Sequence, residues 1–251
     1  MNTEQAVSSQ YSADSTLLSP LQKIGISSLL IIISGLAWMA SLQTQLFIIP
    51  IILDTRVMFA FNFVLIWTVM MVAMMLPSII PMVLLFAKLS QSRVQFGYNV
   101  VPTFLFVLGY FVIWGFMGFI LAVINFFMYP ILMPWNMLIT GSAFVLAGLY
   151  QSTKWKNLCL GHCRSPIHFL SHGWHDGLLG AIKMGSIHGI YCVGCCWGLM
   201  VALIAAGMMN PAYMGLIGIF IFIEKISSKG EFLAKIIGYV FVVFGLGFMI
   251  I

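Results

Sequence analysis

The residues best suited to chemistry are cysteines and histidines, and they are confined to one part of the 251-residue chain. All five cysteines and all five histidines lie between Cys159 and Cys196. Thiolate sulfur and imidazole nitrogen are ligands for soft and borderline metal ions such as Cu(I) and Zn(II). The segment therefore predicts a metal site, drawn from two groups: Cys159, His162 and Cys163, and then His188, Cys192, Cys195 and Cys196.

The second group lies within a long apolar run and has helical spacing. At about 100° per residue, His188, Cys192 and Cys195 fall within roughly 60° of arc, and Cys196 flanks them. Such a face could chelate one ion, and Met184 continues it one turn earlier. The alternative is that these cysteines pack as small apolar side chains, which buried cysteines commonly do.

A methionine stripe is a further source of soft ligands. Met71, Met74 and Met75 are spaced i, i+3 and i+4, shortly before Pro77 and Ser78. Thioethers at this spacing could bind Cu(I), although methionine also fills gaps in apolar cores. Both interpretations stand, and the Pro77-Ser78 pair could turn a free carbonyl or a hydroxyl toward a cavity.

Two other sets of titratable residues have both a structural and a functional interpretation. Glu224 ends an apolar run. It is either a solvated or ion-paired anchor at the membrane boundary, or a ligand or proton acceptor that faces the bundle. His168, His172 and His175 step by four and three, so a helix there would align them. That stripe predicts either a second metal surface or a pH-sensitive polar face.

The elements that position these residues must be membrane helices. The chain is 62% hydrophobic and 7% charged, whereas an average soluble domain is about a quarter charged. Most of the surface must therefore face lipid, and continuous apolar runs favour helices over a barrel. The predicted fold is an all-α polytopic transmembrane bundle (residues 21–251) of about seven spans, with six as the alternative, after a flexible tail (residues 1–20).

The boundaries of the spans follow from the apolar runs and their flanking charges. A polar Cys/His loop is expected at about residues 151–176, with a short helix starting at Ser165-Pro166. All eleven lysines and arginines except Arg56 and Lys183 fall on one side when seven spans alternate, which predicts an N-in, C-out orientation with that loop in the cytoplasm. The expected spans are Ile24–Leu42, Val57–Ala87 with a bend near Pro77, Asn99–Phe127, Trp135–Tyr150, Gly177–Gly207, Pro211–Glu224 and Phe232–Ile251.

Three stretches form a specific pattern: Ala73–Pro81, Cys159–Leu170 and Gly180–Met200, the last containing His-Gly-Ile-Tyr-Cys-Val-Gly-Cys-Cys-Trp. With Gly148–Gln151, Met209-Asn210 and Glu224-Lys225, they resemble an uncharacterised bacterial and archaeal family of predicted metal-binding integral membrane proteins. The resemblance covers about Trp67 to Gly230. It implies a helical membrane fold and a metal, but no activity. His172-Gly-Trp-His175 departs from the family's His-Trp-Arg, so no role for a basic residue is carried over.

The leading functional hypothesis is a plasma-membrane protein that handles copper(I), or zinc, through the second Cys/His group. Transfer to or from the first group is expected, with lipid, a metal chaperone or other subunits of a membrane complex as partners. The alternatives are a redox-active subunit, which uses thiols or a haem on His188, and an accessory subunit without metal. No catalytic triad, phosphate-binding glycine loop or carboxylate pair is recognisable, so we do not expect an enzyme acting alone. The basic residues lie in short loops between apolar runs, as membrane orientation predicts, so no nucleic-acid partner is expected.

Overall fold

The computed structural model describes residues 18–47, 56–94, 101–132, 136–205 and 211–250, and in these ranges every regular element is a helix. The all-α prediction is therefore confirmed, and most of the expected tail (residues 1–20) lies outside the described residues. The helices are α2 (Pro20–Phe47), α3 (Arg56–Val94), α4 (Thr103–Leu132), α5 (Asn136–Gln151), α6 (Lys154–Arg164), α7 (Pro166–His172), α8 (Gly177–Ala205), α9 (Pro211–Ile226) and α10 (Gly230–Ile250).

Among the described residues, five helices are long and apolar enough to cross a membrane, namely α2, α3, α4, α8 and α10. Their outer surfaces are apolar: Leu21 of α2 is 81% exposed and Ile250 of α10 is 85% exposed. Such a surface is unfavourable in water and suits lipid. The predicted membrane-crossing helices are confirmed to this extent. Two further expected spans, α5 and α9, are helices of 16 residues each, so seven spans and an N-in orientation stay predictions.

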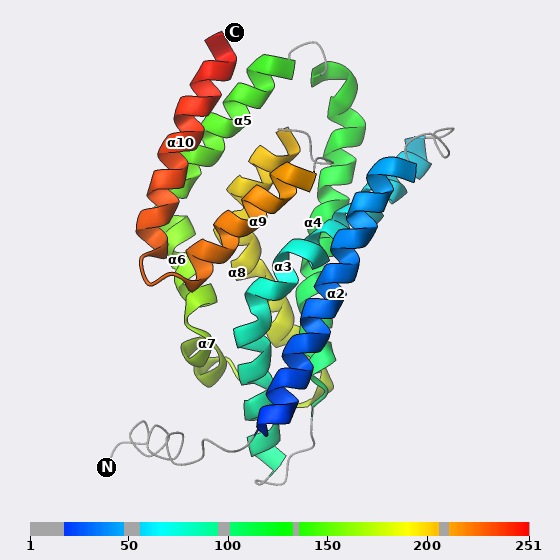
Figure 1. The fold of residues 1–251 in the computed structure, drawn as a ribbon, viewed down its shortest axis with the longest axis vertical. Helices are drawn as coiled ribbons and strands as arrows, with labels where there is room; N and C mark the ends of the chain where they lie inside the picture. The colour runs from blue at the N-terminus through cyan, green and yellow to red at the C-terminus, as the bar shows by residue number, and fades with distance from the viewer. Residues whose placement is uncertain (1–17, 48–55, 95–100, 133–135, 206–210, 251) are drawn as a thin grey trace.

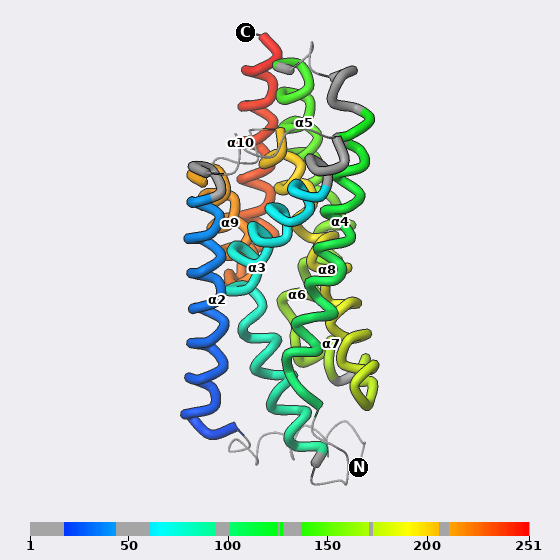
Figure 2. The backbone as a smooth tube through the Cα atoms, turned by 90° about the vertical axis from the view of Figure 1, so that its right-hand side faces the viewer, coloured from blue at the N-terminus to red at the C-terminus, as the bar shows by residue number. Residues whose placement is uncertain are grey.

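The helices pack in pairs along the bundle (Figures 1 and 2). α5 lies beside α10, α4 beside α8, and α2 along α3. Glycine permits the α4–α8 approach, because a Cβ atom on Gly185 would overlap the carbonyl oxygen of Phe106. α2 begins near one end of the bundle and α10 ends at the other (Figure 1).

Helix α3 changes direction partway along its length, as Figures 1 and 2 show, so the predicted bend is present. It contains Pro77 and Pro81. Because Pro77 has no N–H, the carbonyl four residues earlier, on Ala73, loses its intrahelical donor. The hydroxyl of Ser34 on α2 donates to that carbonyl at 2.8 Å. The bend is thus stabilised by the neighbouring helix.

The polar segment expected as a loop is instead mostly helical. Thr153 caps the N-terminus of α6, since its side chain accepts a hydrogen bond from the Lys156 N–H. α7 begins at Pro166, as predicted, but it ends at His172, with Gly173 as its C-cap. His175 lies beyond α7 and is not on one helix with His168. Gly177 then starts α8 with a φ of 81°, a conformation that favours glycine.

Candidate metal centre

The sulfur atoms of Cys192, Cys195 and Cys196 lie within 4.8 Å of one another inside the bundle. All three side chains are buried, at 0%, 2% and 1% exposure. The thiols of Cys195 and Cys196 donate to the carbonyl oxygen of Cys192 at 3.1 and 2.9 Å. No disulfide joins them. The helical spacing read from the sequence therefore does bring three thiols together, and we call this trio the thiol cluster.

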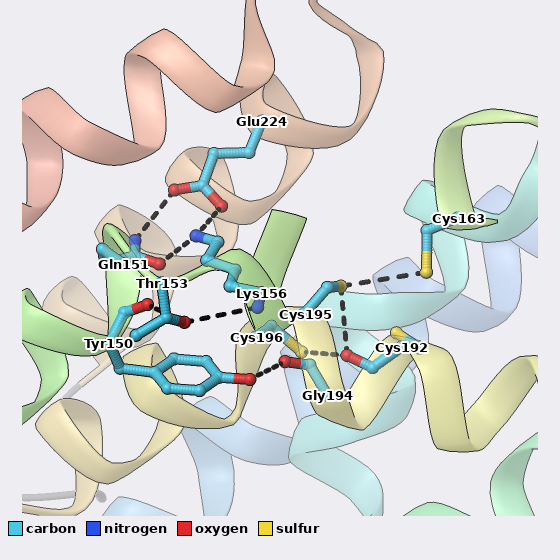
Figure 3. A network of polar contacts seen from close by, with 10 residues as sticks. All are labelled: Tyr150, Gln151, Thr153, Lys156, Cys163, Cys192, Gly194, Cys195, Cys196 and Glu224. Carbon is cyan, nitrogen blue, oxygen red and sulfur yellow. Dashed lines mark hydrogen bonds and ion pairs between the residues drawn. The ribbon is translucent and has the colours of Figure 1, made fainter. Parts of the chain in front are cut away.

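A fourth thiol approaches the thiol cluster from α6. The sulfur of Cys163 lies 3.8 Å from the sulfur of Cys195 (Figure 3). α6 can come this close because residue 194 is glycine: a Cβ atom there would lie 2.6 Å from the sulfur of Cys159. The hydroxyl of Tyr150 on α5 also donates to the Gly194 carbonyl. The two predicted Cys/His groups thus meet along the contact between α6 and α8.

The α6 thiols are half-buried, and both have raised pKa values. Burial raises the pKa of Cys159, and the nearby Cys195 thiol adds to this effect. Hydrogen bonding with Cys192 and Cys195, together with burial, raises the pKa of Cys163 well above its ordinary value. A metal ion would therefore have to displace protons from these thiols.

His162 lies on the same helix as these two thiols and is held in one orientation. Its ring stacks on Tyr191, with centroids 4.2 Å apart and planes 3° apart. Its Nδ1 donates to the Leu158 carbonyl at 2.9 Å. A carbonyl can only accept, so Nδ1 carries the proton and Nε2 of the neutral ring keeps a lone pair suited to a metal ion.

A buried lysine contacts the thiol cluster. The Nζ of Lys225, at the end of α9, lies 3.0 Å from the sulfur of Cys192 and donates to the Ser78 hydroxyl at 3.0 Å. The hydroxyl of Tyr110 on α4 also lies 3.0 Å from the Cys192 sulfur. Sequence reasoning did not include Lys225 or Tyr110 in the site. The only signal was that Lys225 follows Glu224 in a motif stretch.

Glu224 belongs to a separate buried ion pair (Figure 3). Its carboxylate accepts from the Lys156 ammonium at 2.6 Å and from the Gln151 amide at 2.9 Å, and Lys156 also donates to the Gln151 side chain. The side chains of Glu224 and Lys156 are 2% and 0% exposed. Of the two interpretations of Glu224, the ion-paired one fits the structure. The pair fastens α6 to α9 rather than contributing to the thiol cluster.

His188 is not one of the described donors that lie within 4.8 Å of one another. The described donors that lie together within 4.8 Å are the three thiols alone. The imidazole of His188 is 2% exposed and stands among aromatic rings: Phe106, Tyr110 and Phe169, at centroid distances of 6.1, 5.8 and 5.5 Å. Its buried Nδ1 has no hydrogen-bond partner.

The methionine stripe is buried in the core beside the site. Met71, Met74 and Met75 are 0%, 5% and 0% exposed, and Met74 packs against Gly218 of α9. One turn later on α3, the Ser78 hydroxyl accepts a hydrogen bond from Lys225, the lysine that contacts the thiol cluster. The hydroxyl expected near Pro77 thus takes part in the site, while metal binding by the three methionines stays a prediction.

Comparison with known proteins adds one finding. A family model described as PpoB2, copper chaperone, matches residues 64–248. That range includes every residue of both Cys/His groups and of the methionine stripe. Neither a curated protein nor a solved structure matches the chain.

Proposed function

Because the chain belongs to the PpoB2 copper chaperone family, we propose that it binds copper(I) at the thiol cluster within a membrane and passes it to a recipient metalloprotein. The observation that carries the proposal is the convergence of Cys192, Cys195 and Cys196 within 4.8 Å. Soft thiolate ligands suit Cu(I), and zinc is the second candidate.

The surroundings of the thiol cluster support an ion held by thiolates. Cu(I) bound by two or three thiolates carries a net negative charge, which is costly to bury. The Lys225 ammonium, 3.0 Å from the Cys192 sulfur, offsets that charge. The Tyr110 hydroxyl can donate to the same sulfur. A buried lysine beside thiols is therefore explained by a copper–thiolate complex.

The α6 thiols supply a step between the thiol cluster and the surface. Cys163 is half-buried and faces Cys195, while Cys159 and His162 lie on the same helix, all partly accessible. Thiols can exchange Cu(I) one ligand at a time, so α6 offers a transfer route. We propose that the recipient, a metal chaperone or a metalloenzyme subunit, takes copper from α6. We place the protein in the plasma membrane with this helix on the cytoplasmic side.

A redox function is the second candidate, and one distance favours it. The sulfurs of Cys163 and Cys195 are 3.8 Å apart and on different helices, so a modest approach would bring them to disulfide bond length. Such a subunit would give two electrons and two protons to an oxidising partner as the disulfide forms, take them back from a reducing partner, and retain no copper. A haem bound to His188 would absorb visible light, whereas a Cu(I) or Zn(II) site would not.

Elemental analysis of the detergent-purified full chain tests the proposal. We expect near-stoichiometric copper in the wild type and its loss in the Cys192→Ser/Cys195→Ser double variant. Met200→Leu, buried on the same helix, is the control and should retain copper. Equal copper in the double variant and the wild type would refute the thiol cluster, and zinc in its place would refute the choice of metal.

A further inference from the structure

Soft donor atoms continue along α8 beyond the thiol cluster. Met184, His188 and Cys192 are four residues apart, so they follow one another along one helical face at steps of about 6 Å. Met184 and His188 are buried, at 1% and 2% exposure. The row leads from the thiol cluster toward the connection between α7 and α8.

His188 is the least expected member of this row. Its Nδ1 is buried without a hydrogen-bond partner, which destabilises the fold. The rings of Phe106 and Tyr110 stack on the imidazole, and that of Phe169 meets it edge-on. A phenylalanine could fill such an aromatic site without an unsatisfied nitrogen. A free ring nitrogen one helical turn from Cys192 is explained if it binds a metal ion in transit.

Met184 places a sulfur atom between His188 and the surface. Its Sδ accepts a hydrogen bond from the backbone N–H of His175 at 3.4 Å. His175 is partly exposed, and its ring is already engaged by the Gly173 carbonyl and the Lys183 ammonium. Met184, rather than the ring of His175, is therefore the first available soft donor inside this connection.

We propose that Met184 and His188 form a second, transient copper(I) position, through which copper passes between the α7–α8 connection and the thiol cluster. This inference rests on the proposed function. Thioether and imidazole are neutral, so a complex with them keeps the positive charge of Cu(I) and is weaker than one with thiolates. The thiol cluster then draws the ion inward. Neutral sulfur and nitrogen donors also favour Cu(I) over Mg(II) or Ca(II).

The rate of copper loading tests the inference in the detergent-purified full chain. Cu(I), supplied as its acetonitrile complex under argon, is mixed with wild type, Met184→Leu, His188→Phe and Met200→Leu. Met184→Leu conserves volume and His188→Phe conserves the aromatic packing. We expect the first two variants to load at least tenfold more slowly, with unchanged copper at saturation. Met200→Leu lies on the far side of the thiol cluster and should load like the wild type.

A second measurement isolates the proposed position. In the Cys192→Ser/Cys195→Ser background, the residual Cu(I) binding measured by titration should weaken further when His188→Phe is added. Wild-type loading rates in both Met184→Leu and His188→Phe would overturn the inference and leave the proposed function intact. Loss of saturating copper in His188→Phe alone would make His188 a ligand of the thiol cluster itself, and also overturn it. A wild-type chain that retains no copper would instead refute the proposed function.

Discussion

The ammonium nitrogen of Lys225 lies 3.0 Å from the sulfur of Cys192. A positive charge inside an apolar bundle needs a compensating partner, and here the nearest candidate is a cysteine on another helix. The electrostatic environment of the thiol cluster is therefore set by two helices: α8 supplies the thiols, and α9 supplies the positive charge beside them.

Removing the Lys225 charge should weaken copper retention. Lys225→Leu removes the ammonium without adding a sulfur donor, and it leaves a negative copper–thiolate complex without its counter-charge. We expect Cu(I) affinity to fall by about ten- to hundredfold, which corresponds to about 1.4 kcal/mol per tenfold. Competition against a colorimetric Cu(I) chelator measures the change. Lys229→Leu, exposed just after α9, is the control, and tighter binding in Lys225→Leu would show that the lysine competes with copper instead.

Breaking the buried ion pair should destabilise the bundle. Glu224→Gln leaves the Lys156 ammonium buried without a negative partner, at a cost of about 3–5 kcal/mol. The double variant Lys156→Met/Glu224→Gln removes both charges and should recover much of that loss. Unfolding by SDS in mixed micelles measures the stability of each variant. Glu231→Gln, an exposed carboxyl at the start of α10, should change little; a Glu224→Gln protein as stable as this control would contradict the role assigned to the pair.

The spacing of α6 and α8 should depend on Gly194. A methyl group at this position meets the sulfur of Cys159, so Gly194→Ala should displace α6 and separate Cys163 from Cys195. Mild oxidation of the apo protein should then form the Cys163–Cys195 disulfide more slowly, as measured by peptide mass spectrometry. Gly194→Ala/Cys159→Ala restores the space and should restore the rate. Gly161→Ala, where nothing lies within 4 Å, should have no effect, and an unchanged rate in Gly194→Ala would count against this packing.

The reactivity of Cys159 should keep increasing with pH above the pKa of an ordinary thiol. Burial raises its pKa, so less thiolate is present at neutral pH, and only the thiolate reacts with iodoacetamide. Below the pKa, the alkylation rate should rise about tenfold per pH unit, and the rise should persist above pH 8.5, the ordinary thiol value. Mass spectrometry of the Cys159 peptide against free glutathione follows the reaction. A plateau near pH 7 would contradict the raised pKa.

Much of the fold follows from apolar run length, and that is why the expected spans are helical where the structure describes them. Apolar run length did not predict helix α6, because this helix combines lysine, histidine and cysteine with an apolar face that includes Leu160. Its burial against α8 depends on Gly194, whose role appears only once the two helices are placed together.

The thiol cluster could be predicted because periodicity determines which residues share a helical face. Periodicity does not determine depth along the axis: His188 and Cys195 share a face but are seven residues, about 10 Å, apart. Because of this spacing, His188 is not among the donors that lie within 4.8 Å of one another. Lys225 and Tyr110 could not be predicted as neighbours of Cys192, since their positions depend on how α4, α8 and α9 pack.

Glu224 and Lys225 are adjacent on α9, yet one pairs with α6 and the other contacts α8 and α3. Arg164 of α6 also holds the turn that follows α9, through the Ser228 carbonyl. If a recipient takes copper from α6 as proposed and displaces this helix, it would either leave the Glu224 carboxylate unpaired in the apolar interior or shift the end of α9, and with it the Lys225 ammonium beside Cys192. Under the proposed function, the binding of a recipient at α6 would therefore alter copper affinity at the thiol cluster through two consecutive residues of α9.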